Sequence, residues 1–82
     1  MLDVYYSNQT SKFLKKIDQI LLKRILDKIE ILRKIPIIPD SKRVEGYKEK
    51  VFRVRVGDYR ILYEFDNKSL GIVKIDKRAK VY

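Results

Sequence analysis

The feature that most constrains the fold is residues 51–65 (VFRVRVGDYRILYEF), in which two alternating runs are joined by Gly57-Asp58. Alternation of apolar and other residues is typical of β-strands, and Gly-Asp suits a tight two-residue turn. Such a turn predicts one set of cross-strand pairs that is wholly apolar or aromatic: Val56 with Tyr59, Val54 with Ile61, and Phe52 with Tyr63. A slip of one residue would expose this whole set, so the pattern fixes the register. We therefore predict an antiparallel hairpin that packs this side against the core.

The other side of the predicted hairpin carries arginines. The same register pairs Arg55 with Arg60, Arg53 with Leu62, and Val51 with Glu64. Like charges directly across a strand pair destabilise a hairpin by roughly a few tenths of a kcal/mol or more. Stability alone would therefore not favour Arg55 opposite Arg60. We call the side of the sheet that carries Arg53, Arg55 and Arg60 the arginine face.

A third run, residues 72–75 (IVKI), is expected to complete an antiparallel three-stranded meander. A tight turn at Asn67-Lys68 would place Lys74 against the core, which is unfavourable for an unpaired ammonium group. We therefore predict a register that is shifted by one residue. In that register Val73 and Ile75 face the core, while Lys74, Asp76 and Arg78 lie on the arginine face.

The first half of the chain predicts a strand and two helices. Residues 2–6 (LDVYY) are rich in β-forming residues, and the polar cluster after them offers Thr10 or Ser11 as a helix N-cap. Apolar residues then recur at helical spacing over residues 13–32. A single helix of this extent would be about 35 Å long, which exceeds the roughly 25 Å diameter of a domain this small. We therefore expect two helices that form a hairpin, the second capped by Asp18.

Pro36 and Pro39 are expected to end the second helix, because proline lacks a backbone N–H and its ring clashes with the preceding turn. Residues 37–50 are then predicted to be a loop that leads into the sheet. The complete prediction is one α+β domain spanning residues 1–82. It has an N-terminal strand, a helical hairpin and the three-stranded meander, with the helices packed on one face of a four-stranded sheet.

Charge indicates the kind of partner. The chain has 20 Lys and Arg against 11 Asp and Glu, a formal net charge of +9. Such a surface attracts polyanions, with nucleic acid the first candidate and anionic membrane the second, although basic residues also simply keep small proteins in solution. No apolar run is long enough to span a membrane, and the start of the chain lacks the layout of a signal peptide, so we expect a cytoplasmic protein.

Composition also removes several kinds of chemistry. The chain has no cysteine and no histidine, which excludes thiolate zinc sites, cysteine nucleophiles, Ser-His relays and histidine metal ligands. Its three glycines are isolated, so it has no phosphate-binding glycine loop. We expect neither a metal nor a cofactor.

The arginine face has two interpretations. Asp76 or Glu64 could pair with Arg60 and make an ordinary surface network of ion pairs. Alternatively, guanidinium groups in a fixed array bind phosphate oxygens two at a time and stabilise negative charge that develops during a reaction. The excess of basic residues over carboxylates on this face favours the second interpretation.

RNA cleavage is a reaction that such a face could support. The ribose 2′-hydroxyl attacks the adjacent phosphorus in line and the 5′-oxygen leaves, with a base and an acid assisting. Arginine cannot serve as the base because its pKa exceeds about 12. The candidates for proton transfer are Lys48, Lys50, Lys77 and Tyr82.

Two segments resemble a known family. GYKEKVFRVRVGDYRILYEF (residues 46–65) and IVKIDKRAKVY (residues 72–82) resemble the two hallmark regions of the RelE/ParE toxin superfamily, and the resemblance extends over essentially the whole chain. The chain looks most like an archaeal RelE-like toxin. This resemblance implies a toxin of a type II toxin–antitoxin system that cleaves mRNA in the ribosomal A site without metal. A cognate RelB-like antitoxin would neutralise it, through an acidic amphipathic segment on the basic face or an added strand at a sheet edge.

The resemblance also implies site residues. The matching catalytic positions are Arg60, Arg78 and Tyr82, with Lys50 as a looser match. The matching or adjacent positions for binding RNA phosphates are Arg53, Arg55, Lys48 and Lys77. Many relatives have Gly-His where this chain has Asp76-Lys77, and a carboxylate there could neutralise Arg60. A ParE-like toxin that inhibits gyrase without nuclease activity, and an inactive relative that binds only antitoxin or RNA, therefore stay open as alternatives.

Overall fold

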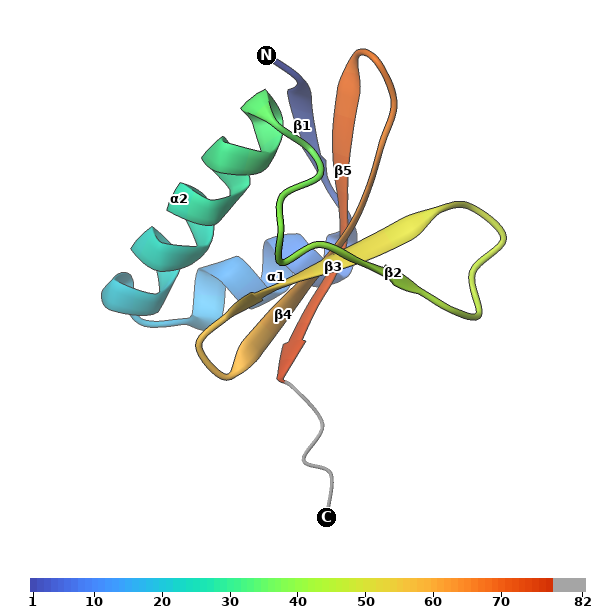
Figure 1. Ribbon diagram of the computed structural model, residues 1–82. Helices are drawn as coiled ribbons and strands as arrows, with labels where there is room; N and C mark the ends of the chain where they lie inside the picture. The colour runs from blue at the N-terminus through green and yellow to red at the C-terminus, as the bar shows by residue number, and fades with distance from the viewer. Residues whose placement is uncertain (78–82) are drawn as a thin grey trace.

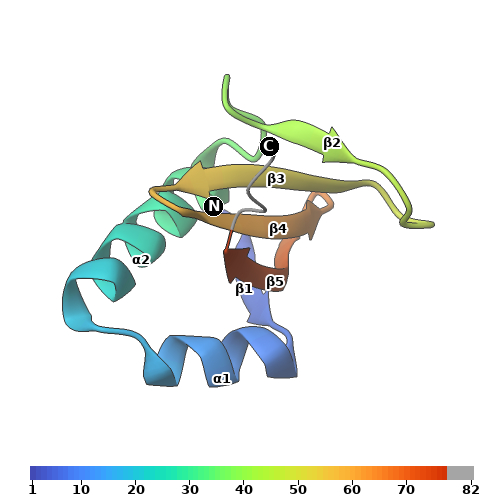
Figure 2. The ribbon, with the colours of Figure 1, turned by 90° about the horizontal axis from the view of Figure 1, so that it is seen from below.

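The computed structural model describes residues 1–77, which form two helices and one five-stranded sheet. In chain order the elements are β1 (Asp3–Tyr6), α1 (Asn8–Lys16), α2 (Gln19–Lys34), β2 (Lys42–Val44), β3 (Val51–Val56), β4 (Tyr59–Phe65) and β5 (Ser69–Lys77). The strand order is β1-β5-β4-β3-β2, with β1 parallel to β5 and every other neighbouring pair antiparallel. Both helices lie on the same side of the curled sheet (Figures 1 and 2), which confirms the predicted α+β class.

The core lies between the helices and this side of the sheet. Its buried members come from α2 and three strands: Ile25, Ile29, Leu32, Val54, Val56, Ile61, Tyr63, Leu70, Ile72 and Ile75. The fully buried Tyr63 donates its hydroxyl to the carbonyl of Pro36 (2.6 Å) and shares a 2.7 Å hydrogen bond with Ser41. Burial raises the pKa of this phenol. Tyr63 therefore fixes the segment after α2 onto the centre of the sheet.

The predicted β3–β4 hairpin is confirmed. The pairs Val56–Tyr59, Val54–Ile61, Phe52–Tyr63, Arg55–Arg60 and Arg53–Leu62 all form. The ladder ends at Phe52–Tyr63, one pair short of the predicted Val51–Glu64. Gly57 adopts a φ of +57°, a left-handed conformation that side chains disfavour and that a tight hairpin turn requires.

The predicted register of β5 is correct over only half of the strand. Far from the β4–β5 turn, Ile61 pairs with Ile75 and Arg60 with Asp76, as predicted. Near the turn, the ladder follows the register rejected above, with Tyr63 opposite Ile72. The two registers meet at a bulge in which Val73 is the unpaired extra residue.

The prediction that Val73 is a core residue is consequently wrong. Val73 is only partly buried, whereas Ile72 is 1% exposed and Ile75 is fully buried. One extra residue lets both isoleucines face the core while Lys74 points to the other side of the sheet. The alternating sequence pattern could not reveal this, because it assumes a ladder without bulges.

The predicted N-cap of α1 is also wrong. The helix begins at Asn8 and is capped by Ser7, whose hydroxyl oxygen accepts the N–H of Thr10 at 3.1 Å. The Ser7 hydroxyl also donates a hydrogen bond to the carbonyl of Val73 at 2.7 Å. Thr10, the predicted cap, is fully buried inside the helix, and its hydroxyl donates to the carbonyl of Ile72. Contact with β5 therefore selected the cap among several suitable residues.

Gln9 completes the edge of β5 beyond the end of β1. Its side-chain amide donates to the carbonyl of Ile75 (3.1 Å) and accepts the N–H of the same residue (3.2 Å). This pair of bonds reproduces the pattern that a neighbouring strand would provide. The N-cap and first turn of α1 thus hold both the bulge and Ile75, two residues beyond it.

The split of the helical region at Asp18 is confirmed, because its carboxylate accepts the N–H of Leu21 at 2.8 Å and α2 starts at the next residue. The helix ends at Lys34, before Pro36. Neither helix of the described residues is long and apolar enough to cross a membrane.

The expected loop over residues 37–50 contains a strand, and this corrects the predicted sheet from four strands to five. β2 pairs Lys42 with Arg53 and Val44 with Val51. The strand β2 has only three residues and two of them are cationic, so its sequence shows no alternation of apolar and polar residues. The strand forms because it pairs with β3, which would otherwise be an unprotected edge of the sheet.

Replacing Gln9 by alanine tests whether α1 holds β5. We expect Gln9→Ala to lower the free energy of unfolding by about 1–2 kcal/mol, because both backbone groups of Ile75 lose a partner. Gln19→Ala is the control, since Gln19 is exposed in the first turn of α2 and should change stability by less than about 0.5 kcal/mol. Urea unfolding of both variants measures the difference. Equal effects would contradict the proposed support of β5.

Candidate functional site

The arginine face is the side of the sheet opposite the helices. Residues paired across strands share a side, so Arg55, Arg60 and Asp76 form one row over β3, β4 and β5. The next row comprises Lys42, Arg53, Leu62 and Lys74. The predicted grouping of Arg53, Arg55, Arg60, Lys74 and Asp76 on one face is thus confirmed. Arg78 and Tyr82 lie outside the described residues.

Arg60 is held by Asp76 in a bidentate ion pair. Its Nε lies 2.8 Å from Oδ1 of Asp76, and its Nη2 lies 3.3 Å from Oδ2. The Nζ of Lys74 approaches the same Oδ2 at 3.7 Å. The hydrogen bonds donated to Asp76 hold the pKa of Arg60 above its ordinary value. One edge of the guanidinium group is therefore occupied by a carboxylate of the same chain.

Arg53 is held by a residue that the sequence analysis did not identify. Its Nη1 donates to the backbone carbonyl of Asp40 (2.9 Å) and lies 3.5 Å from Oδ1 of the same residue. The backbone N–H of Arg55 donates to Oδ2 of Asp40 at 2.7 Å, and this bond lowers the pKa of that carboxyl. Asp40 follows Pro39 in a connecting segment, where no periodic pattern links it to the sheet.

The three arginines consequently differ in what they can bind. The Arg53 side chain is only 12% exposed and braces the segment around Asp40. Arg55 is exposed, and its guanidinium group forms no ion pair with a described residue. Arg60 is partly exposed, and the second edge of its guanidinium group bonds to no residue within 1–77. Arg55 and this second edge of Arg60 are therefore the groups best placed to meet an incoming anion.

Two of the predicted lysines, Lys77 and Lys50, lie away from Arg60. Lys77 pairs with Tyr59, so it lies on the helix side of the sheet. Lys50 lines a hollow of about 340 Å³ together with Glu64 and neighbouring residues. Glu64 is four residues from Arg60 on β4, a separation of roughly 13 Å along the strand. Lys48 is exposed in the connection between β2 and β3.

Tyr47 is a second residue that the sequence analysis did not identify. It is 40% exposed, and its charge interaction is among the causes of the raised pKa of Arg60. An exposed aromatic ring on a basic protein is a suitable platform for stacking a base. Its position after Gly46, in a segment expected to be a loop, gave no signal for this interaction.

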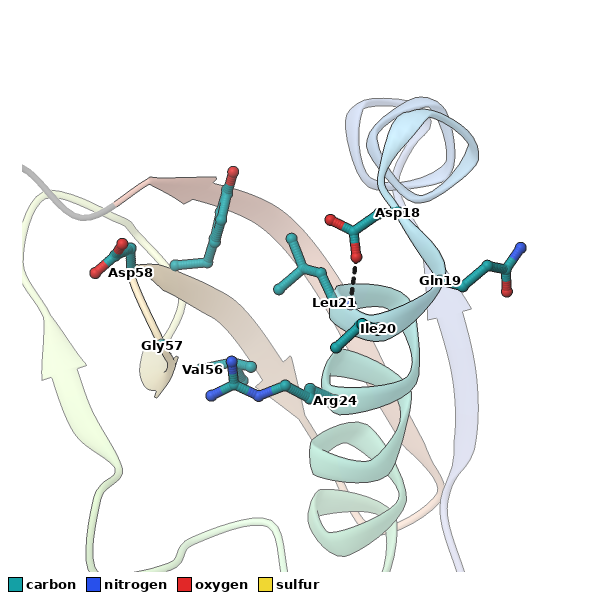
Figure 3. Close-up of a pocket in the computed structure, with 9 residues that line it drawn as sticks. Asp18, Gln19, Ile20, Leu21, Arg24, Val56, Gly57 and Asp58 are labelled. Carbon is teal, nitrogen blue, oxygen red and sulfur yellow. Dashed lines mark hydrogen bonds between the residues drawn. The ribbon is translucent and has the colours of Figure 1, made fainter.

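A larger hollow, of about 580 Å³, lies on the helix side between the start of α2 and the β3–β4 turn (Figure 3). Arg24 reaches across it toward Gly57, where an added Cβ would lie 3.3 Å from Nη1 of this arginine. Asp18 is already engaged in capping α2. Neither side chain belongs to the arginine cluster that the sequence predicted, and we assign the candidate site to the arginine face.

The arginine face can bind phosphate. In its two cross-strand rows, Lys42, Arg53, Arg55, Arg60 and Lys74 face the carboxylates of Asp76 and, from the adjoining segment, Asp40. This leaves an excess of positive charge on rigid strands. Within residues 1–77, no three acidic side chains converge on a point that could hold a metal ion.

The fold and this face define a class of protein. The family model described as the ParE toxin of type II toxin–antitoxin systems, parDE, matches residues 4–82. The chain therefore belongs to this toxin family, within the RelE/ParE superfamily that the two sequence segments resembled. A comparison with curated proteins gives no significant sequence match.

Solved structures extend the assignment. The archaeal RelE–RelB complex from Pyrococcus horikoshii OT3 contains a chain with 28% identity and a TM-score of 0.81, and the match covers 98% of each chain. The RelB–RelE complex from Methanococcus jannaschii gives 25% identity and a TM-score of 0.68 over 94% of this chain and 90% of that one. The intact RelBE complex from E. coli has the same fold, with a TM-score of 0.81 at 15% identity over 98% and 100% of the two chains. The protein is thus a type II toxin with the RelE fold.

Asp40 provides a test of the electrostatics of this face. A carboxyl whose pKa is lower in the folded protein than in the unfolded chain stabilises the fold fully above the unfolded pKa. The stabilisation is lost as the pH falls through the folded pKa. Because the side chain is 39% exposed and screened by solvent, we expect Asp40→Asn to lower the free energy of unfolding by no more than about 1 kcal/mol at neutral pH. The deficit should disappear in acid.

Urea unfolding at about pH 7 and about pH 2 measures this difference. Asp27→Asn is the control, because the ion pair of Asp27 with Lys23 is exposed and contributes less than about 0.5 kcal/mol. A deficit of the same size at both pH values would show that the charge of Asp40 is not what stabilises the protein.

Proposed function

We propose that this toxin is a ribosome-dependent endoribonuclease that cleaves mRNA in the ribosomal A site. The observation that carries the proposal is the convergence of Arg55, Arg60 and Lys74 on a sheet face without a helix among the described residues. The likeness to RelE chains supports it, because the segments that resemble RelE toxins contain these residues. Residues 1–82 would act as one toxin domain in the cytoplasm, where translation takes place.

In the proposed reaction the 2′-hydroxyl attacks the neighbouring phosphorus and the 5′-oxygen departs. Arg60 and Arg55 would bind the scissile phosphate, and Arg78 would stabilise the charge that develops on its oxygens. Tyr82 is the proposed group for proton transfer, because it occupies a matching catalytic position of the segment that resembles RelE toxins. No step requires a metal or a cofactor, because positioning and electrostatic stabilisation can supply most of the rate enhancement.

The remaining predicted residues would bind the flanking RNA. Lys50 is the looser catalytic candidate, and its distance from Arg60 along the sheet suits a contact with an adjacent nucleotide better than proton transfer at the same phosphate. Lys48 and Lys77 are exposed cations that would add charge, and Arg53 would hold the segment that carries Asp40. Tyr47 would provide a surface on which a base stacks.

A cognate RelB-like antitoxin is the proposed protein partner. The chains from P. horikoshii and M. jannaschii were solved as complexes with RelB. The described sheet has two edges, β1 and the short cationic β2, at which an antitoxin strand could pair. An acidic amphipathic segment would complement the net positive charge of the arginine face.

Two observations favour functions other than RNA cleavage. The matching family model is that of ParE toxins, and a ParE-like toxin would inhibit DNA gyrase instead of cutting RNA. The bidentate bond between Arg60 and Asp76 also favours a chain without nuclease activity, including one that only binds antitoxin or RNA. A gyrase supercoiling assay separates these possibilities, because inhibition without RNA cleavage would replace the nuclease proposal.

Primer extension on a translated message tests the nuclease directly. We expect cuts at codon-specific positions that fall about 100-fold with Arg60→Ala or Arg78→Ala, the usual effect of losing one group that stabilises transition-state charge. Arg43→Ala is the matched control, since Arg43 is an exposed arginine that pairs with Phe52 on the helix side of the sheet. Unchanged cutting by both the Arg60 and Arg78 variants would remove the proposed mechanism.

The antitoxin should bind less tightly as salt increases if its contacts are mainly ionic. We expect the Kd to rise about tenfold or more between roughly 50 mM and 500 mM NaCl. Titration calorimetry with the product of the adjacent gene measures this, and Arg55→Ala should weaken binding more than Lys15→Ala, which removes an exposed charge from α1. An affinity that does not change with salt would contradict charge-driven binding and point to strand pairing at β1 or β2.

A further inference from the structure

The carboxylate of Asp76 occupies the position on the arginine face that an anion would take. Both of its oxygens are engaged, Oδ1 by Nε of Arg60, and Oδ2 by Nη2 of Arg60 and, at 3.7 Å, by Nζ of Lys74. A phosphate group bound at this point would use the same donors, because guanidinium groups bind phosphate and carboxylate oxygens in the same two-at-a-time geometry. Asp76 is therefore placed as a substitute for phosphate.

The position of Asp76 is fixed by the backbone. It lies directly opposite Arg60, three residues beyond the bulge at Val73. The hydrogen bonds of Ser7 and Gln9 hold that stretch of β5 in its shifted register. The backbone of Asp76 consequently cannot move away from the site without breaking the β4–β5 ladder.

The Arg60 side chain is the mobile partner. It is 36% exposed, whereas that of Asp76 is 23% exposed, so the guanidinium group can rotate toward solvent while the carboxylate stays in place. An incoming phosphate must either draw Arg60 from Asp76 or bind its free edge beside a negative charge. Both routes weaken binding.

We propose that Arg60 and Lys74 form a phosphate-binding subsite and that Asp76 is its internal competitor, which lowers the affinity of the free toxin for RNA. The proposal rests on the proposed function as an RNA-cleaving toxin, and it adds a residue that sets affinity without touching the reacting atoms. A toxin restrained in this way binds isolated phosphodiesters weakly. It binds well only where several phosphates are presented together, as on a structured ribosomal substrate.

The experiment measures binding of a short fluorescein-labelled single-stranded RNA by fluorescence anisotropy at low salt. Asp76→Asn keeps the shape of the side chain and removes its charge, so we expect about tenfold tighter binding from the loss of one carboxylate in contact with the site. Two controls make the same change in net charge elsewhere. Asp3→Asn lies on β1 beside Ser69, seven residues along β5 from Asp76, and Asp27→Asn lies on α2; both residues are exposed.

We expect each control to tighten binding less than about twofold, because exposed distant charges are largely screened. The gain from Asp76→Asn should disappear in an Arg60→Ala background, which an effect on folding or on general charge would not do. Thermal unfolding of each variant establishes that it is folded. The proposal is overturned if Asp76→Asn binds no tighter than Asp27→Asn, if it binds more weakly than the original protein, or if its gain persists without Arg60.

Failure of this inference is distinguishable from failure of the proposed function. The anisotropy measurement requires neither ribosomes nor cleavage. Tighter binding by Asp76→Asn with no cutting of a translated message would support the phosphate subsite and contradict the nuclease. Cutting by the original protein with no gain from Asp76→Asn would support the nuclease and overturn the competitor.

Discussion

The arrangement of the candidate site depends on the bulge at Val73. This single extra residue joins two registers of the β4–β5 ladder, so that Ile72 and Ile75 both face the core and Lys74 and Asp76 both face outward. The bulge is stable because the first turn of α1 bonds to it, through the Ser7 hydroxyl at Val73 and the Gln9 amide at Ile75. A helix on one side of the sheet thereby fixes which charges meet on the other side.

Electrostatics explain how the sheet tolerates Arg55 opposite Arg60. Direct pairing of like charges is unfavourable, but each arginine of the hairpin has a nearby carboxylate from outside it. Asp76 binds the Arg60 side chain, and Asp40 binds the Arg53 side chain and the Arg55 backbone. The face is partly neutralised and still retains an excess of positive charge. Folding stability and anion binding therefore compete for the same groups.

This competition separates the arginines by function. Arg53 is nearly buried and braces the segment around Asp40, whereas Arg55 is exposed. Arg60 is intermediate, with one edge bound by Asp76 and the other without a partner in the part of the chain that the structure describes. The three arginines of one sheet face thus have different surroundings, and Asp76 is the residue that distinguishes Arg60 from Arg55.

The sequence by itself determined the hairpin register, the split of the helices at Asp18 and the arginine face, because each depends on local periodicity or on a single capping residue. The tertiary structure alone decided the bulge at Val73, the cap at Ser7 and the strand β2. It also brought Asp40 into contact with Arg53 and Arg55. These features arise from hydrogen bonds and charge contacts between segments distant in the chain, and no repeating pattern within one segment encodes such contacts.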